Sequence, residues 1–332
     1  MSLLEREESI RFVKQTFNDE ISKQLSLSTV SAPIFVKDGM GINDDLNGIE
    51  RPVIFPMKSL NDQKASIVQS LAKWKRIRLK ELEIEEGRGI ITDMRALRPD
   101  EDYSPIHSMY VDQWDWEKHI ATKDRSLEYL KTTVLKIYEA LKATEKITAK
   151  KHDDIRAILP EEITFIQSED LYKKHPSLTP KQREDKAAEE FGAIFIIGIG
   201  KELSNGEVHD GRAPDYDDWI SKSDEGYFGL NGDIIVWNPI LKSAFELSSM
   251  GIRVSKESLL EQLAERGLSE RSKLSFHQML LDDYLPQSIG GGIGQSRVCM
   301  FMLRKSHIGE VQVSIWPEKI REQLAKEGVT LL

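Results

Sequence analysis

The chain has 332 residues, of which 39% are hydrophobic and 30% are charged, and it carries a formal net charge of −9. This acidic balance is ordinary for a globular protein and argues against broad nucleic-acid binding, which requires a basic surface. The sequence contains no apolar run of membrane-spanning length and no N-terminal secretory pattern, so we expect neither a membrane span nor secretion.

Predicted helices and strands follow one another irregularly in the first half of the chain. Apolar residues spaced three and four apart predict helices over residues 4–25, 65–81 and 126–144. Strands are expected over residues 30–36, 52–57, 89–97 and 106–116, and the last two form a hairpin around a charged turn. Pro33 restricts the first strand to a sheet edge or an interface, because proline cannot donate to a ladder.

The second half begins with the lysine-rich span 145–190, which we expect to be a peripheral insertion with short helices in a single domain covering residues 1–332. After it, strands are expected over 193–199, 232–236, 245–254 and 310–315, and helices over 256–266, 275–283 and 317–327. Long strands joined by hairpins, with helices between them, predict an α+β fold with a mostly antiparallel sheet flanked by helices. The regular alternation of a parallel doubly wound fold is missing.

A glycine-rich stretch, residues 286–297, has glycine at four of the five positions 290–294 and ends at Arg297. Glycine permits positive φ and lets a backbone lie against a ligand without a Cβ in the way. The apolar run 298–303 that follows predicts a short buried helix. A guanidinium between such a backbone and a helix suits recognition of a phosphate or carboxylate. The alternative is a flexible surface loop with a solvated arginine.

Several motifs that carry known chemistries are missing from the sequence. It has no Gly-x-x-x-x-Gly-Lys-Ser/Thr phosphate loop, no cysteine pair or His-x-x-x-His for zinc, and no Gly-x-Ser-x-Gly nucleophile elbow. Carboxylates and basic residues remain as candidates. Asp233 and Glu246 lie on the two strands after an acidic cluster at 215–218, and two carboxylates with phosphate oxygens can hold Mg²⁺. Alternatively, both carboxylates face solvent.

Two arginines could hold one triphosphate from opposite sides: Arg98 at the hairpin tip and Arg297 after the glycines. That arrangement supports adenylation, in which a carboxylate attacks an α-phosphate and pyrophosphate leaves. A unit ending at Pro33, together with Arg98 and residues 290–297, resembles the three signature motifs of class II aminoacyl-tRNA synthetases.

A narrower resemblance rests on five long motifs. These resemble the ammonia-dependent asparagine synthetases, or aspartate–ammonia ligases, and comprise residues 70–76 (SLAKWKR), 96–102 (ALRPDED), 110–116 (YVDQWDW), 212–219 (RAPDYDDW) and 245–253 (FELSSMGIR). The resemblance implies a class II synthetase-like catalytic fold and a homodimer that uses the region of the first signature motif. It also implies synthesis of L-asparagine from L-aspartate, ammonium and ATP with Mg²⁺, through a β-aspartyl-adenylate, with AMP and pyrophosphate released.

The resemblance also implies residue roles. Arg98 would contact the α-phosphate, Arg297 the distal phosphates, and Lys75 the β-carboxylate of aspartate. The other implied contacts are Gly292 and Gly294 for ATP, Asp233 and Glu246 for Mg²⁺, and Ser70, Gln113, Asp115, Asp217 and Ser249 for aspartate. The second synthetase motif usually reads Arg-x-Glu, whereas here Arg98 is followed by Pro99, Asp100 and Glu101, so either acidic residue could face the adenine.

The nitrogen donor is expected to bind at Asp44. Ammonium needs a carboxylate to hold it and a group to take its proton before it attacks the adenylate. The alternative for Asp44 is an Asx turn in an acidic loop. Glutamine-dependent amidotransferases use a cysteine nucleophile, but the single cysteine, Cys299, lies in an apolar run and is expected to pack. Free ammonia is therefore the expected donor, and lack of disulfides is typical of the reducing cytoplasm, where we expect the protein.

Two other functions remain as alternatives. A relative of aspartyl- or asparaginyl-tRNA synthetases would carry an added anticodon-binding barrel, for which the chain leaves no room, and its acidity fits tRNA poorly. A catalytically inactive paralogue acting as a binding subunit would be expected to lose its phosphate arginines or metal carboxylates, and Arg98, Arg297, Asp233 and Glu246 are all present.

Overall fold

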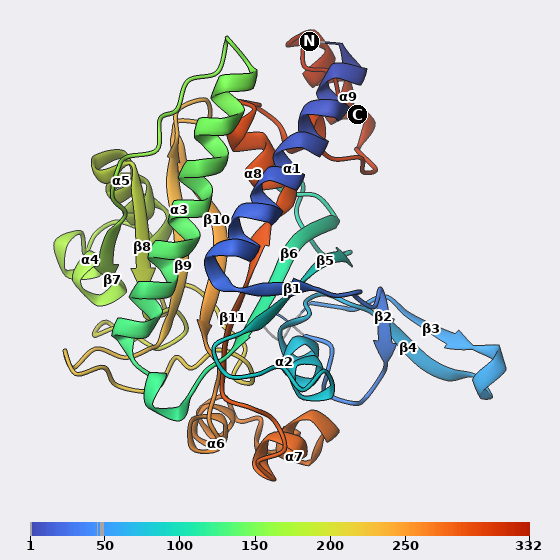
Figure 1. Cartoon of the computed structure of the whole chain (residues 1–332), viewed down its shortest axis with the longest axis vertical. Coiled ribbons are helices and arrows are strands. Elements are labelled where there is room, and N and C mark those ends of the chain that lie inside the picture. The colour runs from blue at the N-terminus through green and yellow to red at the C-terminus, as the bar shows by residue number, and fades with distance from the viewer. Residues whose placement is uncertain (1, 45, 47–49) are drawn as a thin grey trace.

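An eight-stranded sheet organises the chain (Figure 1). The structure is a computed structural model that describes residues 2–44, 46 and 50–332. The strands, in spatial order, are β1 (Leu27–Thr29), β5 (Gly89–Leu97), β6 (Tyr110–His119), β11 (Ser288–Gly294), β10 (Ser243–Ile252), β9 (Asn231–Asn238), β8 (Ala193–Ile197) and β7 (Thr164–Gln167). The outermost pair at each edge is parallel and the five pairs between them are antiparallel. The predicted α+β fold with a mostly antiparallel sheet is confirmed.

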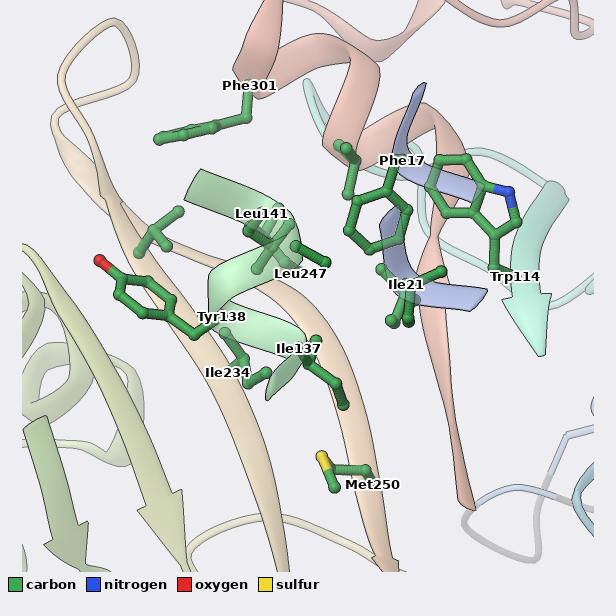
Figure 2. Close-up of a cluster of buried hydrophobic side chains, with 14 of the residues drawn as sticks. Phe17, Ile21, Trp114, Ile137, Tyr138, Leu141, Ile234, Leu247, Met250 and Phe301 are labelled. Carbon is green, nitrogen blue, oxygen red and sulfur yellow. The ribbon is translucent and has the colours of Figure 1, made fainter. Parts of the chain in front are cut away.

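One face of this sheet is covered by α1 (Leu3–Leu25), α3 (Leu127–Lys151) and α8 (Gln295–Met302). A capping box between Ser2 and Glu5 begins α1 and satisfies free backbone N–H groups of its first turn. Figure 2 shows the core that results, in which apolar side chains from these helices meet those of β6, β9 and β10. Phe17 is fully buried with its ring centroid 4.6 Å from that of Trp114, and truncation of such a residue costs about 3–5 kcal/mol.

The remaining helices pack on other parts of the fold. They are α2 (Ala72–Glu81), α4 (Ser168–Lys174), α5 (Pro180–Phe191), α6 (Lys256–Glu265), α7 (Ser275–Leu281), α9 (Glu318–Lys326) and the 3₁₀ turns Lys58–Leu60, Thr122–Asp124, Ser269–Lys273 and Ile308–Glu310. Helix α2 contacts β5, β6 and β11, and α5 contacts β8, β9 and β10. The C-terminal tail joins α1 through a hydrogen bond of 2.6 Å from Arg6 to the carbonyl of Thr330.

A separate three-stranded sheet, β2 (Phe35–Lys37), β4 (Gln63–Ile67) and β3 (Ile54–Met57), projects from the body as an arm (Figure 1). Two sequence predictions were wrong here. The strand predicted over 30–36 is replaced by β1 and β2, because Val30 bonds to β5 whereas Phe35–Lys37 pairs with β4. The helix predicted over 65–81 starts only at Ala72, because its first residues form β4 between two partner strands.

Other differences lie at boundaries and near the C-terminus. The strand predicted over 106–116 starts at Tyr110, and the helix predicted over 126–144 continues to Lys151. The strand predicted over 310–315 is wrong: residues 313–317 have no regular structure, and Val313 and Ile315 are exposed.

The span 145–190 supplies the end of α3, β7, α4 and α5, and β7 lies at the sheet edge. Its role as an insertion in a single domain stays a prediction. Within the described residues, no helix has the length and apolarity needed to cross a bilayer.

Candidate active site

The site is built on the contrast between two neighbouring central strands, β6 and β11. Alternation along β6 sends Trp114 and Trp116 into the hydrophobic core and Gln113, Asp115 and Glu117 to the opposite face. Directly across from these three polar residues, β11 presents Gly294, Gly292 and Gly290 in the same order. A row of polar side chains therefore lies beside a row of glycines.

Glycine is required at residues 290 and 292 because side chains of β6 lie too close to leave room for a Cβ, and not because the backbone needs a positive φ. Gly290, Gly291, Gly292 and Gly294 lie in the extended strand and outside the set of residues with positive φ. A Cβ on Gly290 would lie 1.9 Å from Glu117 Oε2, and one on Gly292 would lie 2.3 Å from Gln113 Oε1. The flexible-loop alternative is wrong, and so is the expectation that these glycines serve positive φ. They leave the space that the polar side chains of β6 occupy.

A small cavity of about 90 Å³, the inner cavity, opens above these two strands. It brings together nine of the predicted site residues, namely Asp44, Ser70, Lys75, Arg98, Gln113, Asp115, Asp217, Ser249 and Gly292. Leu46, Ala72, Tyr216, Arg253 and Gly291 complete the lining. Residues separated by more than 200 positions in the sequence thus meet at a single polar pocket.

Lys75 reaches the inner cavity from α2 and is almost completely buried. Its Nζ donates a hydrogen bond of 2.8 Å to the carbonyl of Gly291 and lies 3.5 Å from Asp115 Oδ2. Burial lowers the pKa of the Lys75 ammonium, and the Asp115 carboxylate opposes that shift. The helix is fixed by Arg76, which donates to the carbonyls of Pro286 and Val254 at 2.8 and 2.7 Å. Lys75 is therefore a positioned cation with donors available for a carboxylate.

A buried ion-pair network forms another wall of the inner cavity. Arg253 donates to Glu117 at 2.8 Å and also bonds to Asp217. Burial raises the pKa of Asp217, although Arg253 and Arg212 oppose that shift. Arg212 donates to Ser249 Oγ at 2.6 Å and pairs with Asp233. The network holds Asp217 and Ser249 in fixed positions facing the cavity.

A second, larger cavity of about 290 Å³, the outer cavity, adjoins the inner one. The two share Arg98, Gln113 and Gly292 in their linings. The outer cavity also contains the predicted residues Glu101, Glu246, Gly294 and Arg297. Its size and its two arginines suit a phosphorylated ligand larger than that of the inner cavity.

The two acidic residues after Arg98 point to different places. Asp100 is paired with Arg51, whose backbone N–H also donates to it at 2.8 Å, and it lies outside the outer-cavity lining. Glu101 lines the cavity, and burial raises the pKa of its carboxyl, with Arg98 and Arg297 opposing. The geometry therefore offers Glu101, and not Asp100, to a ligand in this cavity.

Arg297 is held at the first turn of α8 by three acceptors. Its Nη1 donates to the Glu246 carbonyl at 3.1 Å and lies 3.4 Å from Glu246 Oε2, while Nη2 lies 2.8 Å from His107 Nε2. Because arginine can only donate, His107 accepts at Nε2 in its neutral form. Burial and the charge of Arg297 lower the pKa of His107 to about 4.

Asp233 and Glu246 lie on the paired strands β9 and β10, but they are not directly opposite. Glu246 faces Ile235 and Asp233 faces Ser249, with a β-bulge at Leu247 between the two positions. Burial, and then the Glu246 charge, raise the pKa of Asp233, although Arg212 opposes the shift. The two carboxylates are close enough to affect each other, but Glu246 lines the outer cavity whereas Asp233 is paired with Arg212.

Several site residues were not predicted. Arg212, Tyr216 and Arg253 lie inside motifs that the sequence made conspicuous, and Glu117 continues the alternation of Gln113 and Asp115 by one step. These could have been found by extending the pattern. His107 lies in a loop before β6, and the structure places it in the outer-cavity lining and against Arg297.

The large sheet with its flanking helices has the fold of class II aminoacyl-tRNA synthetases. Asparaginyl-tRNA synthetase from Pyrococcus horikoshii complexed with asparaginyl-adenylate matches with a TM-score of 0.67 at 15% identity, over 94% of this chain and 70% of that chain. Aspartyl tRNA synthetase from Entamoeba histolytica matches with a TM-score of 0.60 at 12% identity, over 92% of this chain and 57% of that chain.

Sequence relatives narrow this class to one family. The aspartate-ammonia ligase family model matches residues 4–328, and the chain belongs to that family. The aspartate–ammonia ligase of Parabacteroides distasonis is 55% identical over all 332 residues, which cover 96% of that protein. The aspartate–ammonia ligase of Clostridium perfringens is 54% identical over the same span, again 96% of its length. The predicted family is confirmed.

Proposed function

We propose that this chain forms L-asparagine from L-aspartate and free ammonium, using ATP and releasing AMP and pyrophosphate. The observation that carries the proposal is the junction of the two cavities at Arg98, Gln113 and Gly292. An amino acid in the inner cavity and a nucleotide in the outer one meet at this junction. Family membership and the names of the close relatives support the same reaction.

Aspartate is bound in the inner cavity through charge complementarity. Lys75 and Arg98 provide cations for the side-chain carboxylate, while Gln113, Asp115 and Asp217 provide acceptors for the α-ammonium group. Ser70 and Ser249 supply smaller polar contacts in the same lining. The three glycines that allow the β6 side chains to approach β11 keep this binding site polar and narrow.

Adenylation follows at the junction. A β-carboxylate oxygen attacks the α-phosphorus of ATP, the bond from that phosphorus to the bridging oxygen of the β-phosphate breaks, and pyrophosphate leaves. Arg98 neutralises charge at the α-phosphate and Arg297 binds the distal phosphates. Glu101 faces the adenine, and the backbone at Gly292 and Gly294 lies under the nucleotide. Alignment and charge neutralisation, and not proton transfer, lower the barrier.

Asp233 and Glu246 would hold Mg²⁺, which supplies positive charge to the phosphates when it is bound. Glu246 lines the outer cavity directly, whereas Asp233 is buried behind it and paired with Arg212.

Amide formation uses Asp44, which is buried at the edge of the inner cavity. Ammonium gives up a proton, the neutral nitrogen attacks the β-acyl carbon, and the carbon–oxygen bond to AMP breaks as a second proton is lost. A carboxylate both attracts the cation and accepts a proton from it. Asp44 Oδ1 accepts the backbone N–H of Leu46 at 3.3 Å, which is the hydrogen bond of the alternative Asx turn and also orients the carboxylate.

A homodimer and a cytoplasmic location complete the proposal. Phe35 and Ile54 of the arm, and Ile34 just before it, are exposed by 50%, 46% and 59%, and exposed apolar side chains of this kind suit burial against a second copy. Sedimentation velocity of the full chain would show a dimer that dissociates when Phe35→Asp is introduced. A wild-type monomer at micromolar concentration would overturn the homodimer.

The nitrogen-donor assay tests the proposed reaction. Purified protein with ATP, Mg²⁺ and aspartate is given ammonium, glutamine or tRNA in separate reactions, and asparagine, AMP and charged tRNA are measured. We expect asparagine and AMP in equal amounts with ammonium alone. Amide formation that requires glutamine would show an amidotransferase instead, and aminoacylation of tRNA would show a tRNA synthetase.

A further inference from the structure

A third cavity of about 250 Å³, the rear cavity, shares none of its described lining residues with the outer cavity. Its lining includes Asp44, Gln69, Lys73, Asp215 and Met40. Asp44 also lines the inner cavity, so this residue stands between the two. Outer, inner and rear cavities therefore adjoin in series, joined first at Arg98, Gln113 and Gly292 and then at Asp44.

We propose that ammonium reaches the aspartyl-adenylate through the rear cavity, where it binds against Gln69 and Asp215 before passing Asp44. The proposal rests on the proposed function, since it concerns the route of the nitrogen donor in that reaction. Gln69 and Asp215 have no part in the proposed binding of aspartate or of the phosphates, and ammonium binding gives both residues a role.

The wall of the rear cavity contains buried polar atoms without protein partners. Gln69 has no exposed surface, and neither its Oε1 nor its Nε2 has a hydrogen-bond partner among the described residues. A buried amide without partners is costly, and a buried side chain of this kind indicates a polar ligand or water. Its backbone is fixed, because its N–H donates to Asn43 Oδ1 at 2.9 Å and its carbonyl accepts from Arg98 at 3.2 Å.

Asp215 presents a second unused acceptor. Lys73, His277 and Arg271 all contact the same oxygen, Oδ2, at 3.0, 3.1 and 3.7 Å. Oδ1 has no hydrogen-bond partner among the described residues, although Asp215 is 1% exposed. The carboxylate is thus anchored through one oxygen and leaves the other as an acceptor.

Ammonium matches this pair of groups in size and hydrogen bonding. It has four N–H donors, it is about as large as a water molecule, and it needs oxygen acceptors in place of its hydration shell. The oxygens of Gln69 and Asp215 would supply the first acceptors, and the Asp44 carboxylate lies next along the path. The cations around Asp215 disfavour a doubly charged metal ion more strongly than a singly charged ion such as ammonium.

The order of the reaction explains why a separate route is needed. When the adenylate forms, AMP fills the junction between the inner and outer cavities, so the outer route is closed to the third substrate. The rear cavity meets the inner one at Asp44, away from that junction. A nitrogen arriving there approaches the acyl carbon without displacing the leaving group.

Two variants test the route while leaving the aspartate and nucleotide contacts in place. Gln69→Leu removes both polar atoms at similar volume, and Met40→Trp narrows the rear cavity from a half-buried position. Gln167→Leu is the matched control, because Gln167 is also buried and lines a different cavity beside β7. For each protein we would measure the KM for ammonium in asparagine formation, aspartate-dependent ATP–pyrophosphate exchange without ammonium, and the melting temperature.

We expect the KM for ammonium to rise roughly tenfold or more in Gln69→Leu, as when a hydrogen bond to a charged group is lost, with exchange within about twofold of wild type. Met40→Trp should lower kcat/KM for ammonium, and Gln167→Leu should match wild type. An unchanged ammonium KM in both rear-cavity variants would overturn the route, as would a parallel fall in exchange. If wild-type protein forms no asparagine from ammonium, the proposed function itself fails, which is a distinct result.

Discussion

Gly292 and Asp115 face each other across β11 and β6, and a Cβ on Gly292 would lie 2.8 Å from Asp115 Oδ1 and 2.3 Å from Gln113 Oε1. The neighbouring Lys75 Nζ lies 3.5 Å from the other oxygen of Asp115. The absence of a side chain at residue 292 therefore determines where the polar side chains of Gln113 and Asp115, and the Lys75 ammonium beside them, lie. Glycine content in this strand is a requirement of the site.

Gly292→Val should damage substrate use more than it damages stability. The added atoms would displace Gln113 and Asp115, so we expect the KM for aspartate and ATP to rise at least roughly tenfold. Small displacements of the groups that position a substrate have large effects on its use. Gly294→Ala is the milder comparison, because its nearest contact is Arg297 Cβ at 3.2 Å. A Gly292→Val protein with a lowered melting temperature and an unchanged ATP affinity would show that the role of this glycine is purely structural.

Asp44→Ala should separate the two halves of the reaction. Asp44 adjoins the inner cavity but is not part of the outer one, so aspartate-dependent ATP–pyrophosphate exchange should stay within about threefold of wild type. Asparagine formation should fall by roughly 10²-fold or more, the usual contribution of a positioned base. Equal loss of exchange and amide formation would instead place Asp44 in adenylation.

Arg253→Met should destabilise the fold strongly. The change leaves Glu117 and Asp217 buried without their main cation, and breaking a buried pair in this way costs about 3–5 kcal/mol. Urea denaturation measures the free energy of unfolding. Adding Glu117→Gln should recover part of the loss, because one of the two uncompensated carboxylates is then neutral. A loss below about 1 kcal/mol in the single variant would show that the network contributes little.

Much of this architecture was predictable because it is local. The periodicity of α1 and α6 and the hairpin of β9 and β10 are properties of short segments, and their positions were predicted closely, as was the start of α3. The residues 65–71 were assigned to a helix because Ile67, Val68 and Leu71 match helical spacing. Tertiary pairing decided otherwise: β4 lies between β2 and β3, and those hydrogen bonds are not encoded in the segment itself.

The site residues came from family resemblance together with spacing, and their geometry needed the structure. Sequence alone could not choose between Asp100 and Glu101, because Asp100 is drawn away by Arg51, almost fifty residues earlier. It also assigned no strand to the β11 glycines and kept a flexible loop as the alternative, since glycine density is typical of turns. Their true role depends on which side chains of β6 lie opposite, a relationship that only strand register defines.

Glu246→Gln should weaken the dependence on Mg²⁺ in adenylation. Loss of one carboxylate charge at the outer cavity should raise the Mg²⁺ concentration for half-maximal exchange at least about tenfold, with less effect at saturating metal. Glu190→Gln, at an exposed carboxylate on α5 paired with Lys174, is the control and should behave as wild type. If both variants show the wild-type Mg²⁺ dependence, Glu246 does not hold the metal.

We expect protonation of His107 at acidic pH to weaken ATP use and to lower the stability of the fold. Its folded-state pKa of about 4 is below the ordinary value of 6.5, so the unfolded chain binds the proton more readily. The stabilisation is fully present above pH 6.5 and is lost as the pH falls toward 4, by at most about 3 kcal/mol. Protonation also ends the acceptance of a hydrogen bond from Arg297 and places two cations together. The KM for ATP should therefore rise over this pH range in wild type, and His107→Gln should flatten both profiles. A His107→Gln protein whose acid profiles overlay those of wild type would assign the pH dependence to other groups.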